Sequence, residues 1–151
     1  MKIKFRLNGR DVEADVHPSE TLLETIRDRF EITSPKGACT QGVCGLCVVL
    51  VDGEPLKSCL VLTPEVQDST VTTLEGIKDE RIETVRESFV EKHGFQCGFC
   101  TPAFILRTYT LLGRKLSREE IREELKGTLC RCTGYKAIVD SVEEALIKVR
   151  E

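Results

Sequence analysis

The sequence predicts an α+β protein in two parts, a mixed α and β unit followed by a helical unit. Three observations support this prediction. The hairpin dipeptides "NG" and "DG" both lie in the first half of the chain. Helical periodicity takes over in the second half, beginning with Ile82, Val85 and Phe89. The eight cysteines fall into two sets of four, one set in each half.

The first element expected is a β-hairpin that turns at "NG" in "RLNGRD". This turn would place Leu7 opposite Arg10 and Phe5 opposite Val12. Alternation along both strands would then gather the apolar side chains on one face. The hairpin therefore predicts a sheet with one side packed on a core.

A helix and a second hairpin follow in the first half. "PSETLLETIRDRF", residues 18–30, predicts a helix with an apolar stripe formed by Leu22, Leu23, Ile26 and Phe30. "CVVLVDGEPLKSC", residues 47–59, predicts a hairpin that turns at "DG". If Val51 lies opposite Glu54, the register carries Cys59 back to the loop that holds three other cysteines.

The second half predicts four helices that would pack as a small bundle. The first carries the stripe named above and is expected to close at Gly94. The second starts just after Cys100, with Pro102 in its first turn, and ends at Gly113. The third opens with the capping box "SREE" at residues 117–120. The fourth is "TGYKAIVDSVEEALIKV", with Tyr135, Ile138, Val142, Ala145, Leu146 and Val149 on one face. A domain boundary is expected between residues 76 and 77.

Composition excludes several classes of function. A net charge of -3 and a pI near 5.6 argue against nucleic-acid binding, which requires a basic surface. The start of the chain lacks the apolar segment of a secretory signal, and no stretch has the roughly 20 apolar residues of a membrane span. The cytoplasm is therefore the expected compartment. Because reducing compartments disfavour disulfides, the cysteines are expected to bind metal.

The spacing of the cysteines helps to distinguish an iron–sulfur cluster from a zinc site. Four cysteines in the first half follow the C-x4-C-x2-C pattern of plant-type [2Fe–2S] ligands with a distant fourth: Cys39, Cys44, Cys47 and Cys59. A structural zinc site usually shows paired C-x2-C knuckles instead. The second set has a spacing that suits either an iron–sulfur cluster or zinc: Cys97, Cys100, Cys130 and Cys132.

The stretches "CTQGVCGLC", "QCGFCTP" and "LCRCTGY" resemble the two-cluster iron–sulfur subunit of the molybdenum hydroxylases, the family of xanthine dehydrogenase, aldehyde oxidoreductase and aerobic carbon monoxide dehydrogenase. The resemblance covers essentially the whole chain. It implies a β-grasp, plant-ferredoxin-like domain over residues 1–76 and a four-helix bundle over residues 77–151. It also implies that both cysteine sets hold [2Fe–2S] clusters.

The same resemblance implies the function. A large partner subunit would carry molybdenum and a pterin cofactor and perform the substrate chemistry, so no catalytic residue is expected on this chain. Electrons would pass through the second cluster, then the first, towards FAD on a medium subunit, in a dimer of heterotrimers. Gln96 and Cys132 match family residues that lie against the pterin.

Two other interpretations remain open from the sequence. The chain would be a free-standing ferredoxin-like carrier if it worked without a molybdenum subunit. It would be a structural zinc module for protein interactions if both cysteine sets held zinc. The substrate of the complete enzyme is not encoded here, because substrate contacts would lie on the partner subunit.

Overall fold

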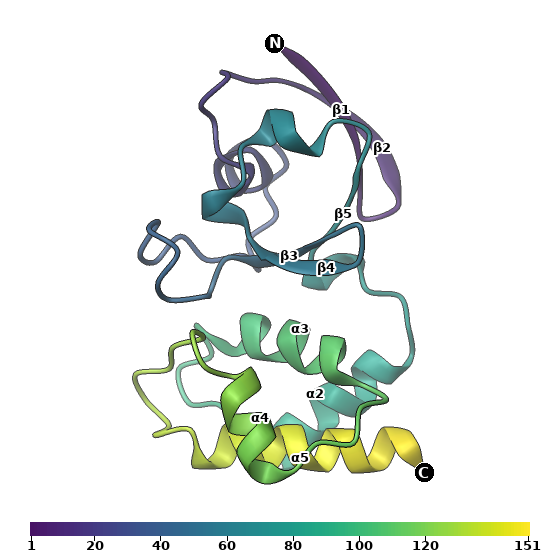
Figure 1. Ribbon diagram of the computed structural model, residues 1–151, viewed down its shortest axis with the longest axis vertical. Coiled ribbons are helices and arrows are strands. Elements are labelled where there is room, and N and C mark those ends of the chain that lie inside the picture. The colour runs from purple at the N-terminus through teal and green to yellow at the C-terminus, as the bar shows by residue number, and fades with distance from the viewer. The chain divides into compact units, whose positions relative to one another are not determined.

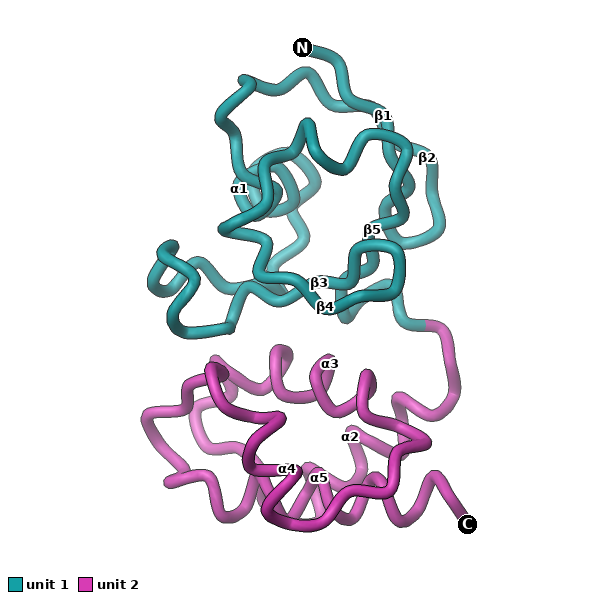
Figure 2. The backbone as a smooth tube through the Cα atoms, viewed as in Figure 1, with its two compact units in different colours: residues 1–77 teal, residues 78–151 magenta.

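The computed structural model describes residues 1–151, which form two compact units, residues 1–77 and residues 78–151 (Figure 2). The first unit combines strands with a short helix, and the second is built from helices (Figure 1). The α+β class predicted from the sequence is confirmed. None of the helices combines the length and the apolar character that crossing a membrane would require.

The first unit is organised around a five-stranded mixed sheet in the order β2-β1-β5-β3-β4. Its strands are β1 (Lys2–Leu7), β2 (Arg10–Asp15), β3 (Val48–Val51), β4 (Glu54–Lys57) and β5 (Thr70–Thr72). β1 and β5 are parallel, and the other neighbours are antiparallel. Both hairpins have the predicted register, with Leu7 opposite Arg10 and Val51 opposite Glu54.

The core of this unit lies on one face of the sheet. Ile3, Phe5 and Leu7 alternate along β1 and are all buried. The helical residues Leu22 and Ile26 belong to the same cluster and are fully buried. The alternating apolar side chains of the strand and the apolar stripe of the helix thus pack together in one layer, as the two periodicities predict.

The helix predicted over residues 18–30 is shorter in the structure. Helix α1 comprises Leu22–Glu24, and a π-helical turn, Thr25–Arg29, continues it. Residues 18–21 lie outside the helix: Pro18 and Ser19 form a turn, and Thr21 pairs with Leu62. The Leu22 N–H donates to the Val61 carbonyl, and the Thr63 N–H donates to the Glu20 carbonyl. Tertiary pairing therefore overrides the local helical pattern at this end.

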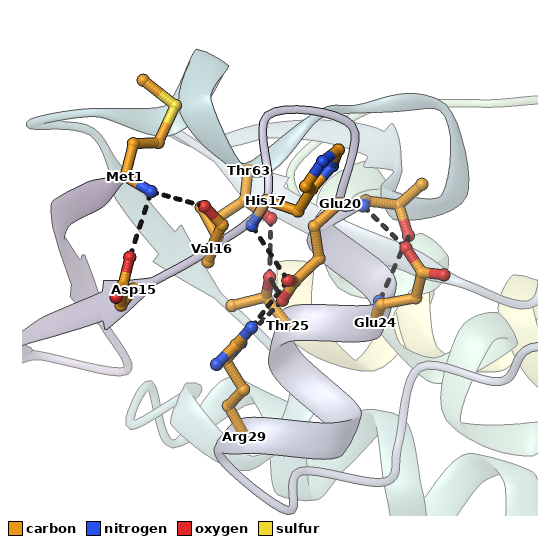
Figure 3. A network of polar contacts seen from close by, with 10 residues as sticks. Met1, Asp15, Val16, His17, Glu20, Glu24, Thr25, Arg29 and Thr63 are labelled. Atoms are coloured by element: carbon orange, nitrogen blue, oxygen red, sulfur yellow. Dashed lines mark hydrogen bonds and ion pairs between the residues drawn. The ribbon is translucent and has the colours of Figure 1, made fainter.

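A polar network fixes this junction (Figure 3). The Arg29 guanidinium donates to both carboxylate oxygens of Glu20 at 2.7 Å, and the Thr25 hydroxyl donates to one of them, also at 2.7 Å. Because Thr25 has a single hydroxyl proton, the Thr63 hydroxyl donates to Thr25 Oγ1, which lies 2.7 Å away. The bonds from Arg29 lower the pKa of Glu20 to about 2, although burial opposes the shift.

The second unit contains α2 (Arg81–Glu91), α3 (Thr101–Leu111), α4 (Arg118–Glu124) and α5 (Lys136–Arg150). α2 contacts both α3 and α5, and α5 also contacts α3 and α4. The predicted apolar stripes are buried, including Ile82, Val85 and Phe89 on α2. The predicted capping box between Ser117 and Glu120 opens α4.

Gly94 has a different role from the one expected. The residue in the left-handed conformation after α2 is His93, with φ 55°, so Gly94 is not the conformational cap of the helix. A Cβ at position 94 would lie 2.3 Å from Ser141 Oγ on α5 and 2.8 Å from Phe89 Cδ1 on α2. Glycine is required here because α2 and α5 approach closely.

Candidate metal centres

The first unit gathers its four cysteines at one end of the second hairpin. Three lie in the loop that leads into β3, and Cys59 lies in the 3-10 turn Ser58–Leu60 directly after β4. The Ser58 N–H and hydroxyl both donate to the Cys47 carbonyl, at 3.2 and 2.6 Å. Cys47 and Cys59 pack with Leu23 in a small buried cluster. The predicted return of Cys59 to the loop is confirmed.

The loop supplies hydrogen bonds to the Cys39 sulfur. The backbone N–H groups of Cys44, Gln41 and Val43 donate to Sγ at 3.3 to 3.4 Å. These bonds, that from Cys44 foremost, lower the pKa of the Cys39 thiol to about 6. Thr40 and Gly42 have positive φ angles of 55° and 75°, which curl the loop around the sulfur. Such a concave run of N–H groups favours an anion.

The pKa of the buried Cys47 thiol is shifted in the opposite direction from that of Cys39. Burial raises the pKa of Cys47 to about 11. A thiol of this kind ionises at neutral pH when it coordinates a cation, because the metal charge replaces the lost solvation. The first set therefore combines one thiol whose pKa is lowered with one whose pKa is raised.

The second unit places its cysteines on two loops. Cys97 and Cys100 precede α3, and Cys130 and Cys132 lie in the loop before α5. The sulfur atoms of Cys97 and Cys132 are 3.6 Å apart. Burial, together with the contact with Cys130, raises the pKa of Cys100 to about 12.

In this set, neighbouring groups stabilise the thiolate form of Cys130. Burial opposes ionisation, but the Thr133 hydroxyl and N–H, at 3.1 and 3.5 Å from Sγ, outweigh it and lower the pKa. The Cys130 N–H in turn donates to the Tyr135 hydroxyl at 2.9 Å. Thr133 and Tyr135 therefore support the ligand loop, a role that cysteine spacing alone does not reveal.

The last helix starts later than predicted. α5 begins at Lys136, and Tyr135 precedes it in the left-handed conformation with φ 71°, although the sequence placed Tyr135 on the helical face. The hydrogen bonds of Tyr135 to the ligand loop account for the difference. By contrast, α3 begins directly after Cys100, as predicted.

The cysteines make contacts in pairs. The Cys44 N–H donates to Cys39 Sγ, and Cys47 and Cys59 pack in one buried cluster. The sulfurs of Cys97 and Cys132 lie 3.6 Å apart, and Cys100 interacts with Cys130. No three Cys, His, Asp or Glu side chains are close enough together to hold a single metal ion. A [2Fe–2S] cluster takes two thiolates on each iron, so two pairs in each unit fit one cluster per unit.

Gln96 and its surroundings are exposed. Gln96 lies between α2 and α3, directly before the exposed Cys97. Phe95 and Phe99, in the same loop, keep 40% and 49% of their surface exposed. Leu129, beside the other ligand loop, is 47% exposed. Large apolar side chains therefore surround the second set of cysteines without a covering layer from this unit.

Both units match iron–sulfur domain families. Residues 5–78 match the family described as a 2Fe-2S iron-sulfur cluster binding domain, and residues 73–143 match the [2Fe-2S] binding domain. The nicotine 6-hydroxylase small subunit of Paenarthrobacter nicotinovorans is 38% identical over 147 residues, or 96% of this chain and 89% of that protein. The chain belongs to the two-cluster iron–sulfur subunits of the molybdenum hydroxylases.

One further relative and one solved structure resemble this molybdenum hydroxylase subunit over nearly its whole length. Caffeine dehydrogenase subunit gamma of a Pseudomonas species is 37% identical over 93% of this chain and 88% of its own length. The crystal structure of quinoline 2-oxidoreductase from Pseudomonas putida 86 matches with a TM-score of 0.90 and 35% identity. That match covers 99% of this chain and 96% of the other. The family favours an electron-transfer subunit of a multi-subunit oxidoreductase over a free-standing carrier or a zinc module.

Proposed function

We propose that this subunit passes electrons from a molybdenum–pterin site to FAD, entering at the second set of cysteines and leaving by the first. The observation that carries the proposal is the division of eight thiols into four in each unit, with Cys47 packed against Cys59 in the first and the sulfurs of Cys97 and Cys132 3.6 Å apart in the second. A [2Fe–2S] cluster bound by four such thiols supplies one-electron transfer. The protein holds the sulfurs and aims hydrogen-bond donors at them.

The ligand sets follow from the same division. We assign one cluster to Cys39, Cys44, Cys47 and Cys59, and the other to Cys97, Cys100, Cys130 and Cys132. We place the domain boundary after residue 76, with a β-grasp ferredoxin-like domain before it and a four-helix bundle after it. The mixed sheet with parallel β1 and β5, and the packing of α2 to α5, support these descriptions.

The partners are a large molybdenum-binding subunit and a medium FAD-binding subunit, assembled as a dimer of heterotrimers in the cytoplasm. Relatives named "small subunit" and "subunit gamma" support a multi-subunit enzyme. Exposed apolar side chains support a protein interface beside Cys97 and Cys132, because large exposed apolar patches mark interaction sites. Eight free thiols suit a reducing compartment.

Metal analysis of the native subunit tests the cluster assignment. We expect about four iron atoms and about four acid-labile sulfides per chain, because each [2Fe–2S] cluster contributes two of each. Reduction with dithionite should give two distinguishable EPR signals. Stoichiometric zinc without sulfide would contradict the proposed function.

Gln96 tests the proposed entry point. Replacing Gln96 with Ala in the complete enzyme should leave both clusters formed, since glutamine is not among the thiolate ligands. Reduction by the substrate of the purified complex should become slower, because the pterin would lose a positioning contact. Dithionite should reduce the clusters as before.

The matched control for Gln96→Ala is Gln67→Ala in the first unit, which changes the same residue type away from the second set of cysteines. We expect it to leave both rates unchanged. Equal rates of substrate reduction in Gln96→Ala and the wild type would contradict the assigned interface.

A further inference from the structure

The Thr133 hydroxyl contacts a cysteine sulfur directly. Its Oγ1 lies 3.1 Å from Cys130 Sγ. The Tyr135 N–H donates to the same Oγ1 at 3.2 Å. The Thr133 hydroxyl donates its one proton to the sulfur, while a lone pair of Oγ1 accepts from the Tyr135 N–H. The result is a relay from the Tyr135 N–H through the Thr133 hydroxyl to Cys130.

Tyr135 prevents this hydroxyl from turning away. Its own hydroxyl accepts the Cys130 N–H at 2.9 Å and donates to the Thr128 carbonyl at 3.2 Å. Its ring packs edge-on against Phe104, with centroids 6.2 Å apart. A left-handed φ of 71° is uncommon for an aromatic residue and is maintained here by these contacts. The loop from Thr128 to Tyr135 is therefore held at both ends.

We propose that the Thr133 hydroxyl sets the reduction potential of the second cluster by donating an O–H···S hydrogen bond to Cys130. The inference rests on the proposed function, in which Cys130 is a cluster ligand. Reduction adds one electron, and part of the added negative charge resides on the thiolate sulfurs. A donor fixed at the sulfur stabilises the more negative state and raises the potential. The step changes no covalent bond and moves no proton.

The first unit provides a contrast. There the Cys39 sulfur accepts its hydrogen bonds from backbone N–H groups, at 3.3 to 3.4 Å. Side-chain substitution does not remove those donors. At Cys130 one donor belongs to a side chain, so a single substitution can remove it while the sulfur, its ligand loop and the backbone bond from the Thr133 N–H remain.

The experiment compares Thr133→Val with Thr133→Ser in the complete enzyme. Valine keeps the branched shape and lacks the hydroxyl, whereas serine keeps the hydroxyl. A redox titration followed by EPR should show that Thr133→Val makes reduction of the second cluster about tenfold less favourable, equivalent to a fall of about 59 mV for a one-electron couple. Thr133→Ser should titrate like the wild type, and the first cluster serves as an internal standard that does not move.

Two outcomes would overturn the inference. One is an unchanged potential of the second cluster in Thr133→Val with its full iron and sulfide content. The other is loss of the second cluster from both Thr133→Val and the smaller Thr133→Ala while Thr133→Ser retains it, since the hydroxyl would then be required for assembly. Failure of the proposed function looks different, because the wild-type protein itself would lack iron and give no EPR signal.

Discussion

At Gly94 an added Cβ would meet buried atoms of the second unit. The nearest atom to a Cβ there belongs to Ser141, which is fully buried on α5 and donates its hydroxyl proton to the Ala137 carbonyl. The second obstacle is the ring of Phe89, which is also buried. Both side chains are buried, so they or the backbone around Gly94 would have to shift.

Replacing Gly94 with Ala should lower the free energy of unfolding by about 1–3 kcal/mol, the usual cost of overpacking a core. The double variant Gly94→Ala with Ser141→Ala should recover part of this loss, because the nearest obstructing atom is removed. Denaturant unfolding of the cluster-loaded protein measures both.

Gly37→Ala is the matched control for this substitution. Its Cβ would meet its nearest neighbour, Leu23 Cδ2, at 3.5 Å, which is ordinary contact. We expect a change within about 0.5 kcal/mol. Equal destabilisation by Gly37→Ala and Gly94→Ala would show that the close approach of α2 and α5 is not the cause.

Single residues also mark the limit of what the sequence predicts. Cysteine spacing predicts the thiols because iron–sulfur ligation imposes a pattern that is local in the chain. The roles of Thr133 and Tyr135 were not predicted, and Tyr135 was placed on a helix. Its conformation depends on contacts with Phe104 and Thr128, which only the folded unit brings together.

At the scale of elements, the turn dipeptides predicted the hairpins more accurately than the apolar stripe predicted the helix over residues 18–30. Both hairpin registers are as predicted, because an Asn-Gly or Asp-Gly turn fixes the pairing of the residues that flank it. The helix over residues 18–30 was predicted too long, since the extended pairing of residues 20–22 with 61–63 is a long-range interaction. That pairing positions the chain that leaves Cys59.

Glu20 makes the stability of this junction depend on pH. Its pKa in the folded state, about 2, lies below the ordinary value of 4.5. The carboxylate therefore stabilises the fold above about pH 4.5, and this contribution is lost as the pH falls towards 2. Replacing Glu20 with Gln should cost about 1 kcal/mol at pH 7, since solvent screens the partly exposed Arg29.

Thermal unfolding across this pH range checks the prediction. The difference in Tm between the wild type and Glu20→Gln should be largest near neutral pH and should disappear as the pH approaches 2. Glu54→Gln, at an exposed position on β4, is the control and should change little at any pH. A difference for Glu20→Gln that does not vary with pH would rule out the ion pair as its source.

At the scale of the whole molecule, the chain consists of two compact units that each have a core and four cysteines. The first core lies between a sheet and a helical segment, and the second lies among helices. Because all four cysteines of each set lie within one unit, loss of a cysteine from one set should leave the other set intact.

Replacing Cys44 with Ser should remove the EPR signal of the first cluster and spare the second, and Cys100→Ser should do the reverse. Both cysteines are buried, so the two variants are matched in burial and in chemistry. Iron content should fall by about half in each, because each [2Fe–2S] cluster contributes two irons. Loss of both signals from either single variant would show that the two sites depend on each other.

The exposure of the cysteines has a consequence for maturation of the subunit. Cys97 and Cys132 are exposed, whereas Cys44, Cys47 and Cys59 are buried. Iron and sulfide can reach two thiols of the second unit after it has folded, but the first unit closes over three of its four. We therefore expect insertion of the first cluster to require its loop to open. Reconstitution of the folded apo-subunit should restore the second cluster faster than the first, and the opposite order would refute this sequence of assembly.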